Sequence, residues 1–354
     1  MKKTLIALTA GAAVAAAAGF GAWIWTQAEA RERWQSVLDR SPLGRDVIYG
    51  EVSYNPFGKT LTVRDIAVPT LQFDGLYRLD PRIAEIRLEG IDPNGRIAGR
   101  QSVSVRGLRL DLLQSGRWLA QERPRAVRLD SDPTGMLATP LPALIALGYH
   151  DVTVDLDTTL EYDADRKALQ LDWRLAGAEM GELSSSLRLG QVEPRLVEKI
   201  ELYQAAMART DSPNERQALL NRLITENMPL LQNVALQTYE LSYAETDLVT
   251  RWLDYADLAT LRLPDEPRRL PEISNLDFDE AEIAAARQAG LPVDTLLATQ
   301  DAIRRFLEQP RSLEWKVEAP EGLPLSLFAS DPVSLMKQIE GTDGVTVRVE
   351  ANGS

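Results

Sequence analysis

The chain contains no cysteine and only one histidine, His150, among its 354 residues. The absence of cysteine excludes disulfides, thiolate nucleophiles and cysteine-based metal clusters. A single histidine excludes a histidine-rich zinc site and leaves one imidazole at most for acid–base catalysis. We therefore assign no catalytic residue, no cofactor site and no metal site, and we expect a protein that is not an enzyme.

Positive charge is also scarce, since 39 Lys and Arg residues stand against 52 Asp and Glu residues and give a formal net charge of -13. This balance disfavours general electrostatic attraction to nucleic acid, so we expect no nucleic-acid partner. The hydrophobic content of 44% is ordinary for a globular protein. The length allows two domains or one large domain.

One long uncharged run opens the chain, from Thr4 to Trp25 directly after Lys2 and Lys3. Its 22 residues, at a helical rise of about 1.5 Å each, match a bilayer core of about 30 Å. Trp23 lies near the end of the run, where an aromatic belt is expected. The sequence therefore predicts one N-terminal transmembrane helix. The anchor residues that we expect to contact lipid are Leu5, Ile6, Leu8, Val14, Phe20, Trp23, Ile24 and Trp25.

The motif Ala28-Glu29-Ala30 is typical of a signal-peptide cleavage site, so secretion to the periplasm after cleavage near Ala30 is the alternative. The length of the run favours an uncleaved single-pass anchor in the inner membrane, with the bulk of the chain in the periplasm. Arg31 and Arg33 oppose this orientation under the positive-inside rule. Large domains nevertheless translocate largely regardless of such charges.

Alternation of apolar and polar residues predicts strands in the first half of the chain. Residues 47–54 and 61–66 flank the turn residues 55–58, which indicates a hairpin. Further strands are expected at residues 83–88 and 102–112.

Two further patterns refine this first half. The change of apolar phase at Gly107 predicts a β-bulge. Residues 148–189 alternate in three successive stretches, with a turn at residues 163–166. This pattern predicts an antiparallel meander with one apolar and one polar face.

The second half mixes helical and strand patterns. Helices are expected at residues 197–207, 213–226, 247–258, 281–289 and 295–307. Strands are expected at residues 231–243, 313–317, 323–327 and 345–349. Strands followed by inserted helices indicate an α+β fold of antiparallel β-meander sheets. We expect a membrane anchor or signal segment at 1–30, a β-rich domain at 31–190 and an α+β part at 191–354 packed on the same body.

Two short motifs superficially suggest chemistry. Gly58-Lys59-Thr60 is similar to the end of a phosphate-binding loop, but Ser53 stands where the loop needs its first glycine, so we interpret it as a hairpin turn. His150-Asp151 could belong to a catalytic relay. The serines at residues 184–186 lie in a strand pattern without a Gly-x-Ser-x-Gly elbow, so we interpret His150 as an ordinary surface or hydrogen-bonded residue.

Two groups of acidic residues also superficially suggest chemistry. Glu161, Asp163 and Asp165 could bind calcium, but Arg166 and Lys167 stand where ligands would be needed, which indicates a polar hairpin tip. A second acidic group precedes an expected helix, where carboxylates suit the positive end of the helix dipole. Its members are Asp277, Asp279, Glu280 and Glu282. A glycosidase-like carboxylate pair cannot be singled out among so many acids.

Three pairs of segments resemble known envelope proteins. Residues 1–7 and 19–23, MKKTLIA and GFGAW, are similar to the YdgA-like family. Residues 49–54 and 61–66, YGEVSY and LTVRDI, resemble the opening β module of AsmA-like proteins. Segments of proteobacterial membrane-anchored proteins are similar to residues 241–248 and 306–310. The resemblance implies an inner-membrane anchor, a periplasmic domain, no established enzyme activity and, for the AsmA-like relatives, envelope lipid handling.

These observations lead to three hypotheses. The first is a non-enzymatic, membrane-anchored periplasmic protein of envelope maintenance whose apolar β-surface contacts lipid, although packing in the core is the ordinary use of such a face. The second is an accessory interaction subunit of an inner-membrane protein complex. The third is a hydrolase with a site made of scattered carboxylates.

Overall fold

The structure is a computed structural model of the chain. It describes residues 34, 47–55, 59–68, 71–73, 77–90, 99–113, 144–208, 213–259, 283–284, 287, 293–325 and 344–353. The expected N-terminal transmembrane helix and its eight anchor residues lie outside these ranges. Among the helices that the structure does describe, none is both long enough and apolar enough to cross a membrane.

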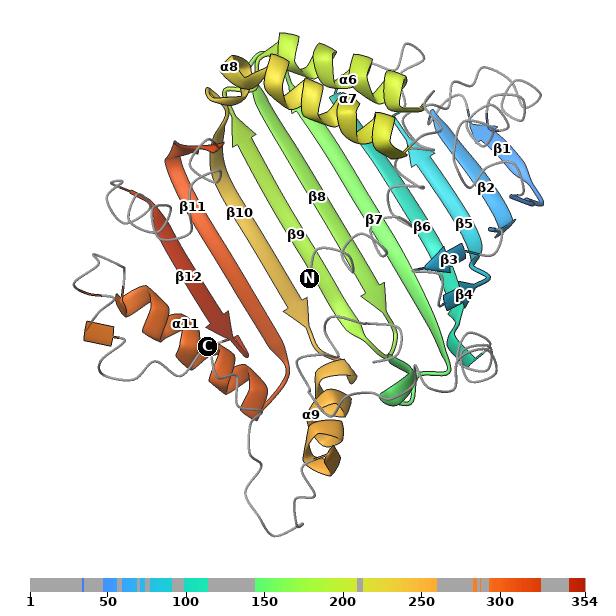
Figure 1. Cartoon of the computed structure of the whole chain (residues 1–354), viewed down its shortest axis with the longest axis vertical. Helices are drawn as coiled ribbons and strands as arrows, with labels where there is room; N and C mark the ends of the chain where they lie inside the picture. The colour runs from blue at the N-terminus through green and yellow to red at the C-terminus, as the bar shows by residue number, and fades with distance from the viewer. Residues whose placement is uncertain are drawn as a thin grey trace. The chain divides into compact units, whose positions relative to one another are not determined.

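The described strands form a ten-stranded antiparallel sheet in the order β1-β2-β5-β6-β7-β8-β9-β10-β11-β12, and a separate pair, β3-β4 (Figure 1). The strands of the first half are β1 Val52–Asn55, β2 Thr60–Ala67, β3 Leu71–Phe73, β4 Tyr77–Leu79, β5 Arg82–Glu89 and β6 Gly99–Asp111. Those that follow are β7 Asp151–Asp163, β8 Ala168–Gly177, β9 Gly181–Gly190, β10 Ala235–Ala244, β11 Ser312–Pro324 and β12 Thr346–Ala351. Strand order in the large sheet follows chain order, as in a meander.

The described helices are α6 Pro194–Ala208, α7 Pro213–Glu226, α8 Met228–Leu231, α9 Leu248–Ala259 and α11 Val293–Glu308. The chain is therefore mostly β with some helix, and the predicted meander at 148–189 is confirmed as β7, β8 and β9. The predicted hairpin is also confirmed, as β1 and β2. Of the helix expected at 281–289, only residues 283, 284 and 287 are described, and these are helical.

Two predicted boundaries are wrong. The strand expected from residue 231 starts at Ala235. The residues before it form the short helix α8, which Pro229 in its first turn favours. The two strands expected at 313–317 and 323–327 are one strand, β11, which continues to Pro324. The intervening Pro320 and Gly322 do not end it, since Gly322 adopts a φ of 86° and the chain bends there without leaving the sheet.

The residues divide into two compact units. Unit 1 comprises residues 1–160, 175–178 and 198–222, and unit 2 comprises the remainder. The domain boundary expected near residue 190 stays a prediction. In unit 1 the buried core consists of Trp34, Val52, Leu61, Val63, Ile66, Ile83, Ile86, Leu88, Val105 and Leu156.

In β2, β5 and β6 the apolar side chains switch between even and odd residue numbers, and the switch occurs at the same level in all three strands. Asp65 on β2 and Gly107 on β6 have φ values of 54° and 61°, and a Cβ added to Gly107 would lie 3.0 Å from Ala84 on β5. The register of β2 against β5, and of β5 against β6, is the same on both sides of this level. The predicted phase change at Gly107 is real, but the expected bulge is absent between β5 and β6. The neighbouring strands change their alternation at the same level, so the register stays constant and no extra residue is inserted.

In unit 2 two core clusters lie on the apolar face of the sheet. The first, called cluster A here, joins α9 and α11 to the strands through Leu253, Ala302, Phe306, Leu307 and Ala351. The second, cluster B, consists of Leu236, Ala319 and Leu323. Helix α11 packs on β11 and β12 (Figure 1).

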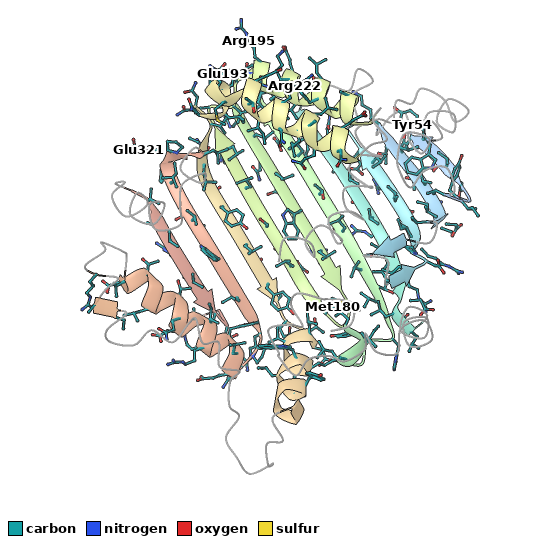
Figure 2. All side chains as sticks on the ribbon, viewed as in Figure 1. Tyr54, Met180, Glu193, Arg195, Arg222 and Glu321 are labelled. Atoms are coloured by element: carbon teal, nitrogen blue, oxygen red, sulfur yellow. The ribbon has the colours of Figure 1, made fainter. Side chains whose placement is uncertain are left out.

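The strand ends of unit 2 are fixed by polar contacts. Met180 and Glu193 lie at opposite ends of these strands (Figure 2). At one end the Tyr243 hydroxyl lies 2.8 Å from the carbonyl oxygen of Met180. At the other end Lys167 Nζ lies 2.6 Å from a carboxylate oxygen of Glu193.

Candidate functional site

The strands of unit 2 separate polar and apolar side chains onto opposite faces because successive side chains alternate. On the polar face Ser186 donates to Asp172 at 2.6 Å, and Arg174 donates to Glu182 at 2.6 Å. Leu171 and Trp173 of β8 alternate with Asp172 and Arg174, so they lie on the other face. Both are half-buried.

A row of the apolar face lies between the two core clusters and belongs to neither. Leu241 on β10 pairs in register with Trp315 on β11. Tyr239 and Val317, one alternation away, pack on cluster B, whereas Tyr243 and Leu313, on the other side, pack on cluster A. We call the pair between them the Leu241–Trp315 row.

Side chains of the Leu241–Trp315 row remain accessible to solvent. Trp315 is 47% exposed and Leu241 is half-buried. Trp315 also pairs in register with Val349 of β12, so the row extends toward the edge strand. An exposed tryptophan flanked by aliphatic residues is a large apolar surface with one polar N–H, which suits contact with an apolar partner.

Charged groups on the polar face compensate one another in pairs. The hydrogen bond from Lys316 lowers the pKa of Glu318, and the same bond raises the pKa of Lys316. The hydrogen bond from Arg174 lowers the pKa of Glu182. Because these groups are well solvated, each pair contributes little to the stability of the fold.

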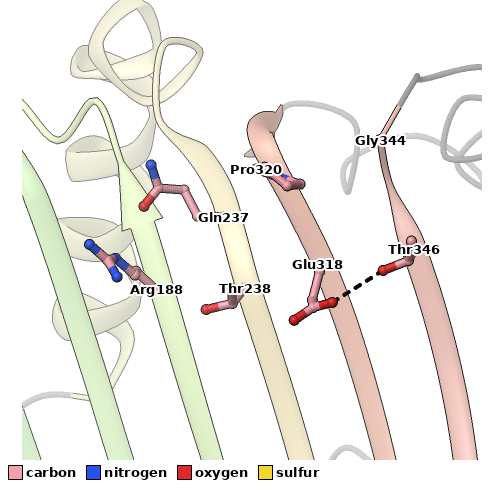
Figure 3. A pocket seen from close by; sticks show the side chains of 7 residues that line it. All are labelled: Arg188, Gln237, Thr238, Glu318, Pro320, Gly344 and Thr346. Atoms are coloured by element: carbon pink, nitrogen blue, oxygen red, sulfur yellow. Dashed lines mark hydrogen bonds between the residues drawn. The ribbon is translucent and has the colours of Figure 1, made fainter.

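A hollow of about 420 Å³ lies on the polar face where β10 and β11 lose their regular pairing (Figure 3). Between β10 and β9, Gln237 is the extra residue of a β-bulge, because Leu236 pairs with Leu189 and Thr238 pairs with Arg188. Against β11, the register passes from Leu236↔Leu323 to Thr238↔Glu318, so residues 319–322 stand opposite Gln237 alone. The lining residues are Arg188, Gln237, Thr238, Glu318, Pro320, Gly344 and Thr346.

The sequence motifs that suggested chemistry occupy structural positions. Lys59, with a φ of 47°, lies in the turn before β2, while Gly58 is outside the described residues. Asp151 pairs with Arg109 at 2.8 Å, and His150 is exposed. The nearby polar groups therefore do not form a relay: no hydrogen bond to the imidazole of His150 is seen among the described residues.

The serines and acids considered above are likewise engaged in the sheet. The hydroxyl oxygens of Ser184 and Ser242 lie 2.7 Å apart. Asp163 accepts the backbone N–H groups of Asp165 and Arg166, each at 3.0 Å, as expected of a polar hairpin tip. Across the described ranges, no group of three Asp, Glu or His side chains converges to hold a metal ion. The acidic group at residues 277–282 lies outside the described residues.

Sequence reasoning missed the hollow. Its only sequence signal is the run Glu318 to Gly322, which contains Pro320 and resembles a turn between two strands. An apolar face was predicted for the meander at 148–189, whereas the open row lies on β10 and β11, and alternation alone could not locate it.

Comparison with known proteins adds no relative. No protein-family model matches the chain, and no curated protein is significantly similar to it. The resemblance to YdgA-like and AsmA-like proteins therefore stays a prediction.

Proposed function

We propose that this protein is a non-enzymatic, membrane-anchored component of the bacterial envelope that presents the apolar face of unit 2 to lipid. The observation that carries the proposal is the Leu241–Trp315 row, where a 47% exposed tryptophan lies between two closed core clusters. An indole suits the interface between lipid chains and water, because one edge is polar and the rest apolar.

The beginning of the chain supports a location of unit 1 at a membrane surface. Trp34 is 1% exposed in the core of unit 1, and it follows Trp25, the end of the uncharged run, by nine residues. Nine residues span at most about 32 Å even when fully extended. An anchor at residues 4–25 would therefore hold unit 1 close to the membrane surface.

Site-specific photocrosslinking tests the lipid contact. A benzophenone amino acid replaces Trp315 in the full chain, in cells labelled with a radioactive fatty acid. We expect a labelled lipid adduct on irradiation. The matched control carries the same group at Arg348, which is exposed on the polar face of the neighbouring strand. Position 348 should give no lipid adduct.

The outcomes separate the hypotheses. If position 315 forms adducts with protein alone, this face docks on another membrane protein and does not contact lipid. Equal lipid labelling at positions 315 and 348 would show unspecific membrane proximity and would overturn the proposal.

The location is tested independently of the ligand. A reporter enzyme that is active only outside the cytoplasm is fused after Ser354. We expect activity together with recovery of the protein in the membrane fraction. A reporter active only inside the cell, or a protein found in the cytosolic fraction, would contradict the proposed location.

A further inference from the structure

Two close approaches at glycines accompany the irregular pairing beside the hollow on the polar face. A Cβ on Gly190 would lie 2.6 Å from Nε2 of Gln237, so the glutamine amide occupies the space above Gly190. A Cβ on Gly322 would lie 2.7 Å from the Cβ of Ala235. Both approaches fix the irregular stretch of β10 and β11 that opens the hollow. Irregularities of this kind commonly redirect side chains at binding sites.

Two charged side chains, Arg188 and Glu318, are among the described residues that line the hollow. Glu318 is engaged by Lys316 at 2.9 Å, and its other oxygen accepts from Thr346 at 3.5 Å. Arg188 lines the same hollow and has no acidic partner within the described part of the chain. A guanidinium free to make two parallel hydrogen bonds is suited to a phosphate or carboxylate.

The other lining groups are suited to hydroxyls. Gln237 and Thr238 each offer both a donor and an acceptor, and Glu318 offers acceptors beside them (Figure 3). Register places Thr238 between Arg188 on β9 and Glu318 on β11. One small ligand could therefore contact the cation and the hydroxyl-binding groups together.

We propose that this hollow binds a small, soluble, hydroxyl-bearing anion, with its phosphate or carboxylate on Arg188 and its hydroxyls on Gln237, Thr238 and Glu318. The site is separate from the lipid surface. A lipid on the Leu241–Trp315 row cannot place its headgroup here, because the two features lie on opposite faces of the same strands.

Isothermal titration calorimetry on the full chain in a non-ionic detergent tests this inference. The probe is glycerol 3-phosphate, compared with glycerol, which lacks the charge, and with inorganic phosphate, which lacks the carbon-bound hydroxyls. We expect glycerol 3-phosphate to bind at least about tenfold more tightly than either, since hydrogen bonds to charged groups and hydroxyls both contribute.

Two variants and one control locate the site. Arg188→Gln should weaken glycerol 3-phosphate binding about tenfold, because it removes the charge-assisted bonds. Gly190→Ala should weaken it as well, because the new methyl displaces the flexible Gln237 amide while the backbone φ stays acceptable to alanine. Arg174→Gln removes the same charge from the same face, outside the hollow, and should leave binding unchanged.

Three results would overturn the proposal. The first is equal binding by Arg188→Gln and Arg174→Gln, which would show a general charge effect. The second is equal binding of glycerol and glycerol 3-phosphate, and the third is equal binding of inorganic phosphate and glycerol 3-phosphate. Folding of each variant is verified by its far-ultraviolet circular dichroism, so that a loss of binding reports on the hollow.

Discussion

Tyr243, near the end of β10, donates a hydrogen bond from its hydroxyl to one carboxylate oxygen of Glu245, and the other oxygen caps the first turn of α9. The second oxygen accepts the backbone N–H groups of Val249 at 2.8 Å and Thr250 at 3.1 Å. A carboxylate in this position satisfies donors that the first helical turn leaves unpaired, and it suits the positive end of the helix dipole. One side chain therefore links the strand to the helix.

Glu245→Ala should destabilise the protein by about 1–2 kcal/mol, because it removes a helix cap and leaves the Tyr243 hydroxyl one acceptor fewer. Urea unfolding followed by circular dichroism measures this loss. Glu240→Ala, on the polar face of the same strand, is the matched control and should cost less than about 0.5 kcal/mol. Equal losses for the two variants would show that the capping contact contributes nothing of its own.

Gly322→Ala should destabilise the protein by at least about 2 kcal/mol, since the new Cβ would collide with Ala235 in addition to the backbone strain. Gly344 is the matched control: its φ of 82° resembles the 86° of Gly322, but no atom lies within 4 Å of its added Cβ. Gly344→Ala should cost only about 1 kcal/mol. Thermal and urea unfolding of both variants give the difference. If the two lose the same stability, the close approach of Gly322 to Ala235 is not a constraint on the fold.

The sequence predicted the regular parts of the sheet because alternation is a local signal. The stretch from 148 to 189 shows it in three successive segments, and all three are strands. The course of β11 was missed because Pro320 and Gly322 together are typical of a turn. Whether such residues end a strand or bend it depends on the neighbouring strand, and here β10 accommodates them with one irregularity at Gln237.

The candidate sites were predictable only in part, for a similar reason. Alternation identifies the apolar face that carries Trp315, but the exposure of that side chain depends on which segments cover it. Arg188 is one of many exposed charges in sequence, and its position in a hollow arises from pairing across three strands. Contacts between strands distant in sequence leave no local pattern.

The Arg174–Glu182 pair should make stability depend on pH in one direction. The hydrogen bond from Arg174 lowers the pKa of Glu182 in the folded state below its usual value of 4.5. A lowered carboxyl pKa contributes stability above the usual value, and this contribution is lost as the pH falls through the lowered pKa. Arg174→Gln should therefore lower stability near neutral pH and have no effect in strong acid.

Midpoints of urea unfolding, taken between about pH 2 and pH 7, measure this dependence. This pH range covers the titration of carboxyl groups. The effect should be less than about 1 kcal/mol, because the side chains of Arg174 and Glu182 are 48% and 39% exposed. Arg195→Gln removes an exposed arginine without an ion pair in the described residues and controls for net charge. A difference between the wild type and Arg174→Gln that persists unchanged into strong acid would contradict the assigned cause.

Trp34 should contribute more stability than Trp315, because it is 1% exposed and packs edge-on against Tyr49 with ring centroids 6.4 Å apart. Trp34→Ala should cost about 3–5 kcal/mol through lost burial and an unfilled cavity. Trp34→Phe should cost much less, since the indole N–H is buried without an acceptor in the described part of the chain and its removal offsets part of the lost volume.

Trp315→Ala is the contrasting variant, since a 47% exposed side chain loses less on truncation, about 1 kcal/mol. Urea unfolding of the full chain in detergent compares the three variants. If Trp34→Ala unfolds at the same urea concentration as Trp315→Ala, then Trp34 is not part of the core of unit 1. The nine residues after Trp25 would then no longer limit the distance between unit 1 and the proposed anchor at residues 4–25.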